Sequence, residues 1–374
     1  FMVPGFAMGD SGQGGGDTRR MMYGNSKLIG IMPEGSKYAN PIFTLFMSPD
    51  FVYVVNIVLS LLALLFSFDC ICGEKEDQTL KLMLTNSVPR DVVLLGKWIG
   101  GTVSILFPFI VAFMLGIIIV SFNPRVSFGD DAMSRLILIL FSSMMYISIF
   151  FLMGMVFSVF TSRSSTSLIL SLFAWVFFVL VIPNLAPVIA RQVVPMKTSD
   201  QIVLQAENMA KDMQERIREM PSNEPNRKKK IERIREELPK KIRELENLWL
   251  NALERQTKTA MNISRVSPSA NYIYIMAGLS GTGVEDYNKL REEIFRYREY
   301  LAQQREDFLK NDNSKPIPML YVKVHPDEVP KFRDRRLDLE TSVNNIVWDF
   351  AIMLIYLALF FQIAFVKFLR YDVK

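Results

Sequence analysis

Charged residues are absent from five long stretches of this 374-residue chain. The stretches lie between Asp50 and Asp69, Lys97 and Arg125, Arg135 and Arg163, Arg163 and Arg191, and Asp349 and Lys367. A helix needs roughly 20 apolar residues to cross about 30 Å of hydrocarbon, and every stretch approaches or exceeds that length. The sequence therefore predicts a multi-pass, all-α integral membrane protein with spans at residues 51–68, 98–122, 136–160, 167–189 and 345–366.

Histidine and cysteine are scarce, which excludes most metal and catalytic sites. His325 is the one histidine, and Cys70 and Cys72 are the two cysteines. Zinc sites use several Cys or His ligands, and a Ser-His-Asp triad needs a histidine as its base. The cysteines lie two residues apart at a span end, where a helix points them to different faces, so we expect free thiols. We expect no metal site, no catalytic residue and no enzyme activity in this chain.

A phosphate-binding loop is also missing. The pattern G-x-x-x-x-G-K-[ST] occurs nowhere, because the Gly-Lys pair at residues 96–97 is followed by Trp98 and lacks the upstream glycine. The Gly-Thr-Gly segment at 281–283 has no strand–helix context and is interpreted as a turn after a helix. The chain is therefore expected to bind no cofactor by itself.

A charged segment is present between the last two spans, at residues 191–343. We predict helices at 200–220 and 284–310, with a third, charged helix between them that carries one apolar stripe. The stripe consists of Ile231, Ile234, Leu238, Ile242, Leu245, Trp249 and Leu253. Residues 221–225 (PSNEP) predict a hairpin turn before this helix, and Pro239 is expected to interrupt and kink it. The basic run at 227–230 lies among acidic residues and is interpreted as a solvated helix face rather than a nucleic-acid or lipid patch.

The distribution of Lys and Arg predicts which side of the membrane each loop occupies. Short cytoplasmic loops carry more of these residues, and the 69–97 loop and the C-terminus are richer in them than the short loop at 123–135. This places 69–97 and the tail in the cytoplasm, and both 1–50 and 191–343 outside it. An N-terminal segment that lies outside the cytoplasm without a signal peptide to export it implies one further span before Phe1. The expected domains are thus an extracytoplasmic segment at 1–50, a transmembrane part at 51–190, an extracytoplasmic helical domain at 191–343, and a last span with a short tail at 344–374.

The cytoplasmic loop contains the clearest local pattern. Within residues 73–90, Leu80, Met83, Leu84 and Val88 share one helical face, and acidic residues crowd the first turns, where the helix dipole favours them. Pro89 is expected to end the helix. The pattern predicts a short amphipathic helix at the membrane surface, and it fits an interfacial loop without a partner as well as a docking element.

Two segments carry a resemblance to a known family. The stretch GEKEDQTLKLMLTNSVPRDVVLLGKWIGG (residues 73–101) resembles the signature that connects the second and third spans of ABC-2-type transporter permeases, although Gln78 stands where the family often has glycine. The segments ISRVSPSA (263–270) and AGLSGTG (277–283) resemble the branch of these permeases with a large extracytoplasmic insert before its final span. With the span order, the likeness covers nearly the whole chain, and it also implies the missing first span, since these permeases usually have six.

The resemblance implies an ABC-2 (type V exporter-like) bundle powered by ATP and Mg²⁺ in a separate ATPase subunit, present in two copies. A second permease chain, identical or paralogous, completes the complex, and the localisation is the inner membrane of a prokaryote. The residues implied to contact the ATPase, or to set the geometry of a coupling helix, are Glu74, Glu76, Thr79, Leu80, Leu84, Pro89 and Arg90. The implied extracytoplasmic family motif is Ser267, Pro268, Gly281, Thr282 and Gly283. No nucleic-acid partner is expected.

Several functions remain open at this point. Span interiors with almost no ionisable groups argue against an ion-driven carrier and suit an amphiphilic or exported substrate. The long charged hairpin instead favours a non-transporting complex that moves an outer domain against a periplasmic or extracellular partner. A membrane sensor lacks a recognisable signalling domain, and a membrane enzyme lacks an acid–base constellation.

Overall fold

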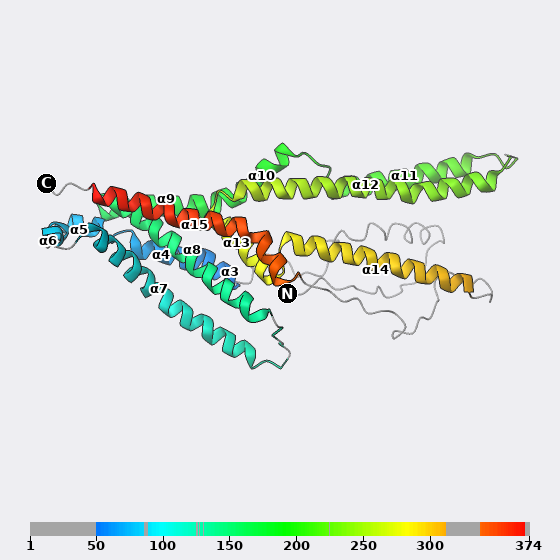
Figure 1. Cartoon of the computed structure of the whole chain (residues 1–374). Helices are drawn as coiled ribbons and strands as arrows, with labels where there is room; N and C mark the ends of the chain where they lie inside the picture. The colour runs from blue at the N-terminus through cyan, green and yellow to red at the C-terminus, as the bar shows by residue number, and fades with distance from the viewer. Residues whose placement is uncertain are drawn as a thin grey trace, which may run out of the picture. The chain divides into compact units, whose positions relative to one another are not determined.

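The computed structural model describes residues 50–85, 89–124, 126, 128–129, 131–223, 225–311 and 337–370 (Figure 1). Every regular element in these residues is helical. The chain divides into two compact units, one with residues 186–263 and the other with residues 51–185 and 264–374, so each is described by itself. Residues 1–49, where most of the first extracytoplasmic segment was predicted, lie outside the described residues.

Five helices of the described residues are long and apolar enough to cross a membrane, as the sequence predicted. They are Phe51–Glu76, Arg90–Ser121, Ala132–Phe160, Ser164–Val193 and Leu339–Leu369. Each of the five extends past its predicted bounds at one end at least. A helix does not have to end at its first charged residue, because polar ends can lie in the interface. The first span comprises α3 (Phe51–Tyr53), η1 (Val54–Leu59) and α4 (Ser60–Ser67), and continues into α5 (Cys72–Glu76).

The remaining spans consist of α7 (Arg90–Ser121), α8 (Ala132–Phe160), α15 (Leu339–Leu369), and a fourth span made of α9 (Ser164–Trp175), η2 (Val176–Val181) and α10 (Ile182–Val193). Both η segments are π-helices, a form that usually appears as short insertions in α-helices and often near functional sites. Each of them contacts the short helix α13 (Pro268–Ser280).

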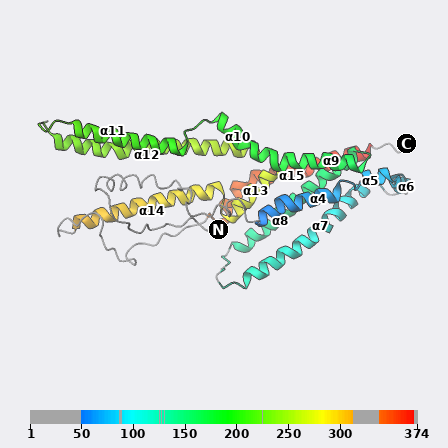
Figure 2. The ribbon, with the colours of Figure 1, turned by 180° about the vertical axis from the view of Figure 1, so that it is seen from behind.

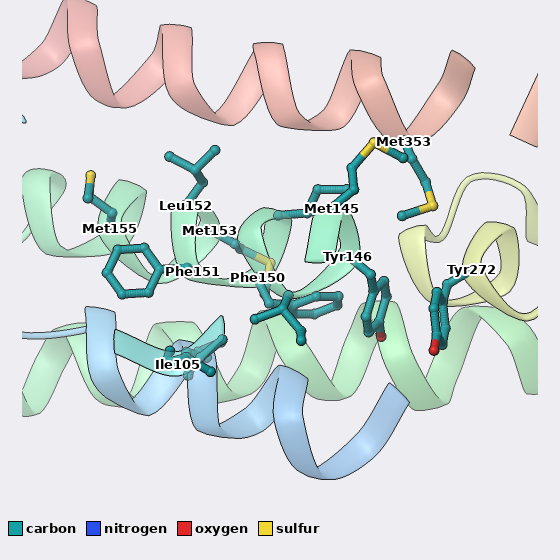
Figure 3. Close-up of a cluster of buried hydrophobic side chains, with 14 of the residues drawn as sticks. Ile105, Met145, Tyr146, Phe150, Phe151, Leu152, Met153, Met155, Tyr272 and Met353 are labelled. Carbon is teal, nitrogen blue, oxygen red and sulfur yellow. The ribbon is translucent and has the colours of Figure 1, made fainter. Parts of the chain in front are cut away.

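The core of the larger unit is built around α8, of whose 29 residues 15 are buried. It contacts α4, α7, α9, α13 and α15, and both ribbon views place it inside this group (Figure 1 and Figure 2). Figure 3 shows the large side chains that fill this core, including Phe150 and Phe151. Helices in lipid gain little from the hydrophobic effect and associate through close packing and hydrogen bonds.

Two glycines allow the close packing of α8. A Cβ atom at Gly154 would lie 2.1 Å from Ser67 Oγ, and one at Gly101 would lie 2.2 Å from Phe151 Cζ. Neither distance is compatible with a side chain. Small residues at these points therefore let α4 and α7 approach α8.

The smaller unit contains a helical hairpin of α11 (Ser199–Glu219) and most of α12 (Arg227–Ser264). Thr198 and Gln201 form a reciprocal capping box that starts α11. The indole of Trp249 donates to the carbonyl of Lys197, which fastens α12 to the start of the hairpin. All seven predicted stripe residues of α12 are buried or half-buried, so the helical period was interpreted correctly.

Other expectations for this segment have mixed outcomes. The helices predicted at 200–220 and 284–310 are confirmed as α11 and α14 (Val284–Asn311). The interruption predicted at Pro239 is wrong, because α12 continues through it as one helix of 38 residues. The exposed proline removes one backbone hydrogen bond, and the many remaining turns of α12 tolerate that loss.

The expected extracytoplasmic domain at 191–343 stays a prediction, and its residues fall into both compact units of the chain. Residues from Ser264 onward belong with the spans, and α13 packs against α8 and α15. Eight of the 13 residues of α13 are buried. The physical reason is that α13 is apolar and too short to cross a membrane, so it satisfies its surface by packing inside the bundle.

Candidate functional site

The predicted coupling segment is folded as two helices rather than one. α5 (Cys72–Glu76) and α6 (Thr79–Thr85) are separated at Asp77 and Gln78. Gln78 has a φ of 60°, the left-handed conformation that glycine adopts without strain. Glycine, which the resemblance led us to expect at this position, would adopt this conformation without strain. The single helix predicted across residues 73–90 is therefore wrong, and Pro89 precedes the first residue of α7 instead of ending the same helix.

Glu74 connects the coupling segment to the next span. Its Oε1 atom lies 2.6 Å from Nζ of Lys97 on α7, and the same ammonium group donates to the carbonyl of Cys70 at 2.6 Å. The two charged side chains are 27% and 20% exposed, so water screens the pair only in part. Glu74 thus holds α5 to α7.

Two further charges hold α5 between the end of one helix and the start of the next. Glu76 Oε2 accepts a hydrogen bond of 3.0 Å from the backbone N–H of Ser164 at the start of α9. Lys75 donates to the carbonyls of Val159 and Thr161 at the end of α8. An anion at a helix N-terminus and a cation at a C-terminus both complement the helix dipole. The sequence predicted Glu76 but not Lys75.

A buried serine completes this arrangement. Ser158 Oγ accepts hydrogen bonds of 2.9 Å from the backbone N–H groups of Ile71 and Cys72, which satisfies the first turn of α5. Cys70 and Cys72 are free, as predicted. Together, α5 is fixed by contacts to α7, α8 and α9. We name this set the α5 clamp: Glu74, Lys75, Glu76, Lys97, Ser158 and Ser164.

The predicted residues of α6 separate into anchoring and surface positions. Leu80 is 1% exposed and packs inside, whereas Thr79 and the unpredicted Leu82, which is 71% exposed, lie at the surface. Arg90 donates to the carbonyl of Leu369 at 2.9 Å, so the start of α7 and the end of α15 meet at the same end of the bundle as α5 and α6 (Figure 1). The side chain of Leu84 lies outside the described residues.

The second predicted motif caps the helix α13 at both ends. Ser267 Oγ accepts from the backbone N–H groups of Ser269 and Ala270, and Pro268 occupies the first helical position. Gly281 ends the helix with a φ of 71°. The predicted turn after a helix is therefore confirmed. Thr282 and Gly283 continue this turn, with Thr282 N–H donating to the Ala277 carbonyl and Gly283 N–H donating to Asp286.

The start of α13 is bound to both π-helical segments. Ser267 Oγ donates to the carbonyl of Phe178 in η2, and Ser269 Oγ donates to Oδ1 of Asn56 in η1 at 2.8 Å. Tyr146 of α8 also donates to Asn56 Oδ1, at 2.6 Å. The buried side chains of Ser269 and Asn56 thereby obtain hydrogen-bond partners inside the bundle.

The aromatic ring of Tyr146 also contacts α13. It stacks on Tyr272 of α13 with centroids 4.4 Å apart, as Figure 3 shows, and the Tyr272 hydroxyl lies 3.1 Å from Ser143 Oγ on α8. Both tyrosines are completely buried. The hydrogen bonds of Tyr146 and Tyr272 allow these two polar side chains to lie among apolar helices.

An ion pair lies just before α13. Arg265 Nε is 2.7 Å from Asp349 Oδ1 and its NH2 group is 3.2 Å from Oδ2, and Asp349 is 1% exposed. Tyr356, about two turns further along the same face of α15, donates to the carbonyl of Val266. Asp349 lies inside the last span and is a residue that the sequence reasoning missed. Its position within the predicted span at 345–366 was the signal, because a charged residue inside a span indicates a functional or structural contact.

These contacts form a second fixed point, the α13 joint, made by Asn56, Tyr146, Phe178, Arg265, Ser267, Ser269, Tyr272 and Asp349. The α5 clamp and the α13 joint hold helices and contain no nucleophile–base pair. Among the described residues, no group of three or more His, Cys, Asp or Glu side chains is placed to hold a metal ion. The contacts of both sets hold helices against one another.

Comparisons with known proteins agree with this architecture. The family model described as "ABC-2 family transporter protein" matches residues 11–373, nearly the whole chain. A search of the curated proteins found no match. The match includes the α5 clamp, the α13 joint and all five helices that can cross a membrane. The chain is therefore a multi-pass membrane protein that belongs to the ABC-2 transporter family, of the permease type.

Proposed function

We propose that this chain is the permease subunit of an ABC transporter, which moves an exported or amphiphilic substrate with energy from a separate ATPase. ATP and Mg²⁺ belong to that ATPase, which is expected in two copies beneath a pair of permease chains. The observation that carries the proposal is the α5 clamp. Because α5 is bonded to α7, α8 and α9, a displacement of α5 would be transmitted to three spans at once.

The clamp changes the roles proposed for the predicted site residues. Glu74, Glu76 and Arg90 bond to other parts of this chain, Leu80 is buried, and Pro89 precedes α7, so these five set the geometry. The ATPase is proposed to contact the exposed turn and the start of α6, which present Asp77, Gln78, Thr79 and Leu82. A role for Leu84 stays a prediction.

The test compares the same substitution at two exposed leucines. Leu82→Asp places a charge on the proposed docking surface without touching the clamp, since Leu82 is 71% exposed. Leu248→Asp places the same charge on α12, where the leucine is 68% exposed. We expect at least a tenfold loss of co-purified ATPase, and loss of permease-stimulated ATP hydrolysis, for Leu82→Asp alone. Full retention of both properties in Leu82→Asp contradicts docking at α6.

A second candidate is a non-transporting complex that moves an outer partner. It is favoured by the α13 joint, because α12 ends at Ser264, directly before the Arg265–Asp349 pair. Motion of α15 at this pair reaches the base of α12. The two candidates differ when the permease and ATPase are reconstituted without other proteins: a transporter hydrolyses ATP in response to its substrate, whereas the mechanical complex responds only when its extracytoplasmic partner is added.

A further inference from the structure

Each π-helical segment passes over one backbone carbonyl. In an α-helix, an N–H group donates to the carbonyl four residues earlier. A π-helical turn uses the carbonyl five residues earlier instead, so one carbonyl loses its usual N–H partner where the pattern changes. In η1 this carbonyl belongs to Asn56, because the N–H of Ser60 donates to the carbonyls of Val55 and Ile57 on either side of it.

The carbonyl of Phe178 is the one passed over in η2, because the N–H of Ile182 donates to the carbonyl of Phe177. The hydrocarbon around a span holds no water that could act as the missing donor. The donor is instead the hydroxyl of Ser267, the N-cap residue of α13. The π-helical turn of the fourth span therefore depends on a side chain of α13.

The carbonyl of Asn56 also has a hydroxyl donor, and this donor connects the two segments. Ser60 Oγ donates to the carbonyl at 2.5 Å. The indole of Trp175, the residue before η2, donates to the same Ser60 Oγ at 2.9 Å. The side chain of Asn56 accepts from Ser269 of α13 at 2.8 Å. Thus η1 is bonded both to the start of η2 and to the first turn of α13.

We propose that the first turn of α13 is a conformational switch that holds the first and fourth spans in their π-helical form. Ser267 and Ser269 both lie in this turn, so one displacement of α13 removes a hydrogen bond from each span. Without the Ser267 hydroxyl, the α-helical pattern is favoured, because it gives the Phe178 carbonyl an N–H donor from its own span.

The change would turn the part of the fourth span beyond η2, which includes α10, by about 100°, the rotation of one helical residue. The first span follows because the bond between Trp175 and Ser60 connects the two segments. The proposal concerns the helices of this chain alone and holds whether or not an ATPase docks on α6.

The experiment reports the helical register of the fourth span with two nitroxide labels on that span. Phe173, before η2, and Leu185, beyond it, are 72% and 48% exposed, and both are replaced by cysteine for labelling. In a continuous α-helix the two labels would point about 120° apart, whereas the π-helical turn brings them to within about 20° of each other. Conversion should lengthen their separation by about 5 Å. Cys70 and Cys72 are replaced by alanine, and the full chain is placed in nanodiscs.

The first variant removes the hydroxyl that η2 needs. Ser267→Gly takes away the donor to Phe178, and glycine is still accepted at a helix N-cap. We expect at least half of the molecules to lose the dipolar broadening of the EPR spectrum of frozen samples. Ser267→Thr retains a hydroxyl and should keep the broadening of the unsubstituted protein.

The second variant tests the connection from the first span and leaves α13 intact. Ser60→Ala breaks the bonds to Trp175 and to the Asn56 carbonyl, and the same loss of broadening is expected. Ser142→Ala is the matched control: Ser142 is also fully buried and donates to the carbonyl four residues earlier, but it lies in α8 outside both π-helical segments.

Unchanged broadening in Ser267→Gly or in Ser60→Ala overturns the proposal. A loss in Ser142→Ala as large as in these variants also overturns it, since the loss of any buried hydroxyl would then suffice. If Ser267→Gly does not fold, the comparison of Ser60→Ala with Ser142→Ala decides the outcome.

Discussion

The α5 clamp and the α13 joint both hold a short helix among the spans, and they do so with different chemistry. The clamp uses charged side chains that remain partly exposed: Glu74 and Lys97 are 27% and 20% exposed. The joint uses neutral hydroxyl and amide groups that are fully enclosed, together with one ion pair whose carboxylate is 1% exposed. Where water reaches, a charged side chain costs little free energy to position, but its ion pair adds little stability. Where water is excluded, each polar group must have a partner, and losing one costs more.

The largest loss of stability is expected at the α13 joint. Asp349→Ala removes a carboxylate that is 1% exposed and pairs with Arg265, and it is expected to destabilise the protein by about 3 kcal/mol. The measurement is the midpoint of thermal unfolding in detergent. Glu292→Ala is the control, because the Glu292–Arg296 pair is exposed, at 68% and 73%.

The double substitution Arg265→Met with Asp349→Leu sharpens the result. Replacing both charges by apolar groups of similar size removes the guanidinium together with the carboxylate, so most of the lost stability should return. If Asp349→Ala unfolds no earlier than Glu292→Ala, the ion pair does not hold the joint, and the contrast with the clamp fails.

An intermediate effect is expected at the clamp. Lys97→Met breaks the pair with Glu74 and the bond to the Cys70 carbonyl, and we expect a loss of about 1 kcal/mol because water screens the pair in part. Salt at 0.5 M should reduce the difference from the wild type, since screening weakens partly exposed pairs, and should reduce the Asp349→Ala effect less, because Asp349 is 1% exposed. Lys258→Met, at an exposed pair with Glu254, is the control. A salt-independent loss would mean that the clamp is enclosed like the joint.

The smallest effect is a gain in stability at the turn between α5 and α6. Gln78→Gly relieves a left-handed backbone conformation, and we expect the unfolding free energy to rise by about 0.5–1 kcal/mol. Gln78→Val, which is β-branched, should lower it. Chemical denaturation of the three proteins in one detergent provides the ranking, and equal stability of the valine and glycine variants would contradict the left-handed turn.

Much of the fold could be predicted from local sequence. The spans follow from the absence of charge over residues such as 98–122, and α11, α12 and α14 follow from apolar residues at three- and four-residue spacing. The place of α13 could not be predicted this way. Its 13 residues are too few for a span and border a charged segment, and only the contacts of Tyr272 and Ser269 place it inside the bundle.

Only part of the candidate site could be predicted from the sequence. The segment and its acidic residues were found, but the sequence did not show that Glu74 and Glu76 bond to other helices of this chain or that Leu80 is buried. Their contact with an ATPase stays a prediction. Lys75 and Ser158 were missed because their partners lie more than 80 residues away in the chain. Hydrogen-bond partners so far apart in the chain leave no pattern in the local sequence.

By itself, the sequence determined that the chain is a membrane protein, because lipid forbids uncompensated charge over about 20 residues, and that it belongs to the ABC-2 family. Only the tertiary structure decided that Asp349 is paired with Arg265, that Gln78 divides the coupling segment, and that α13 bonds to two π-helical segments. The reason is physical: apolar spacing acts within one helix, whereas a polar group inside a bundle is stable only beside the particular partner that folding brings to it.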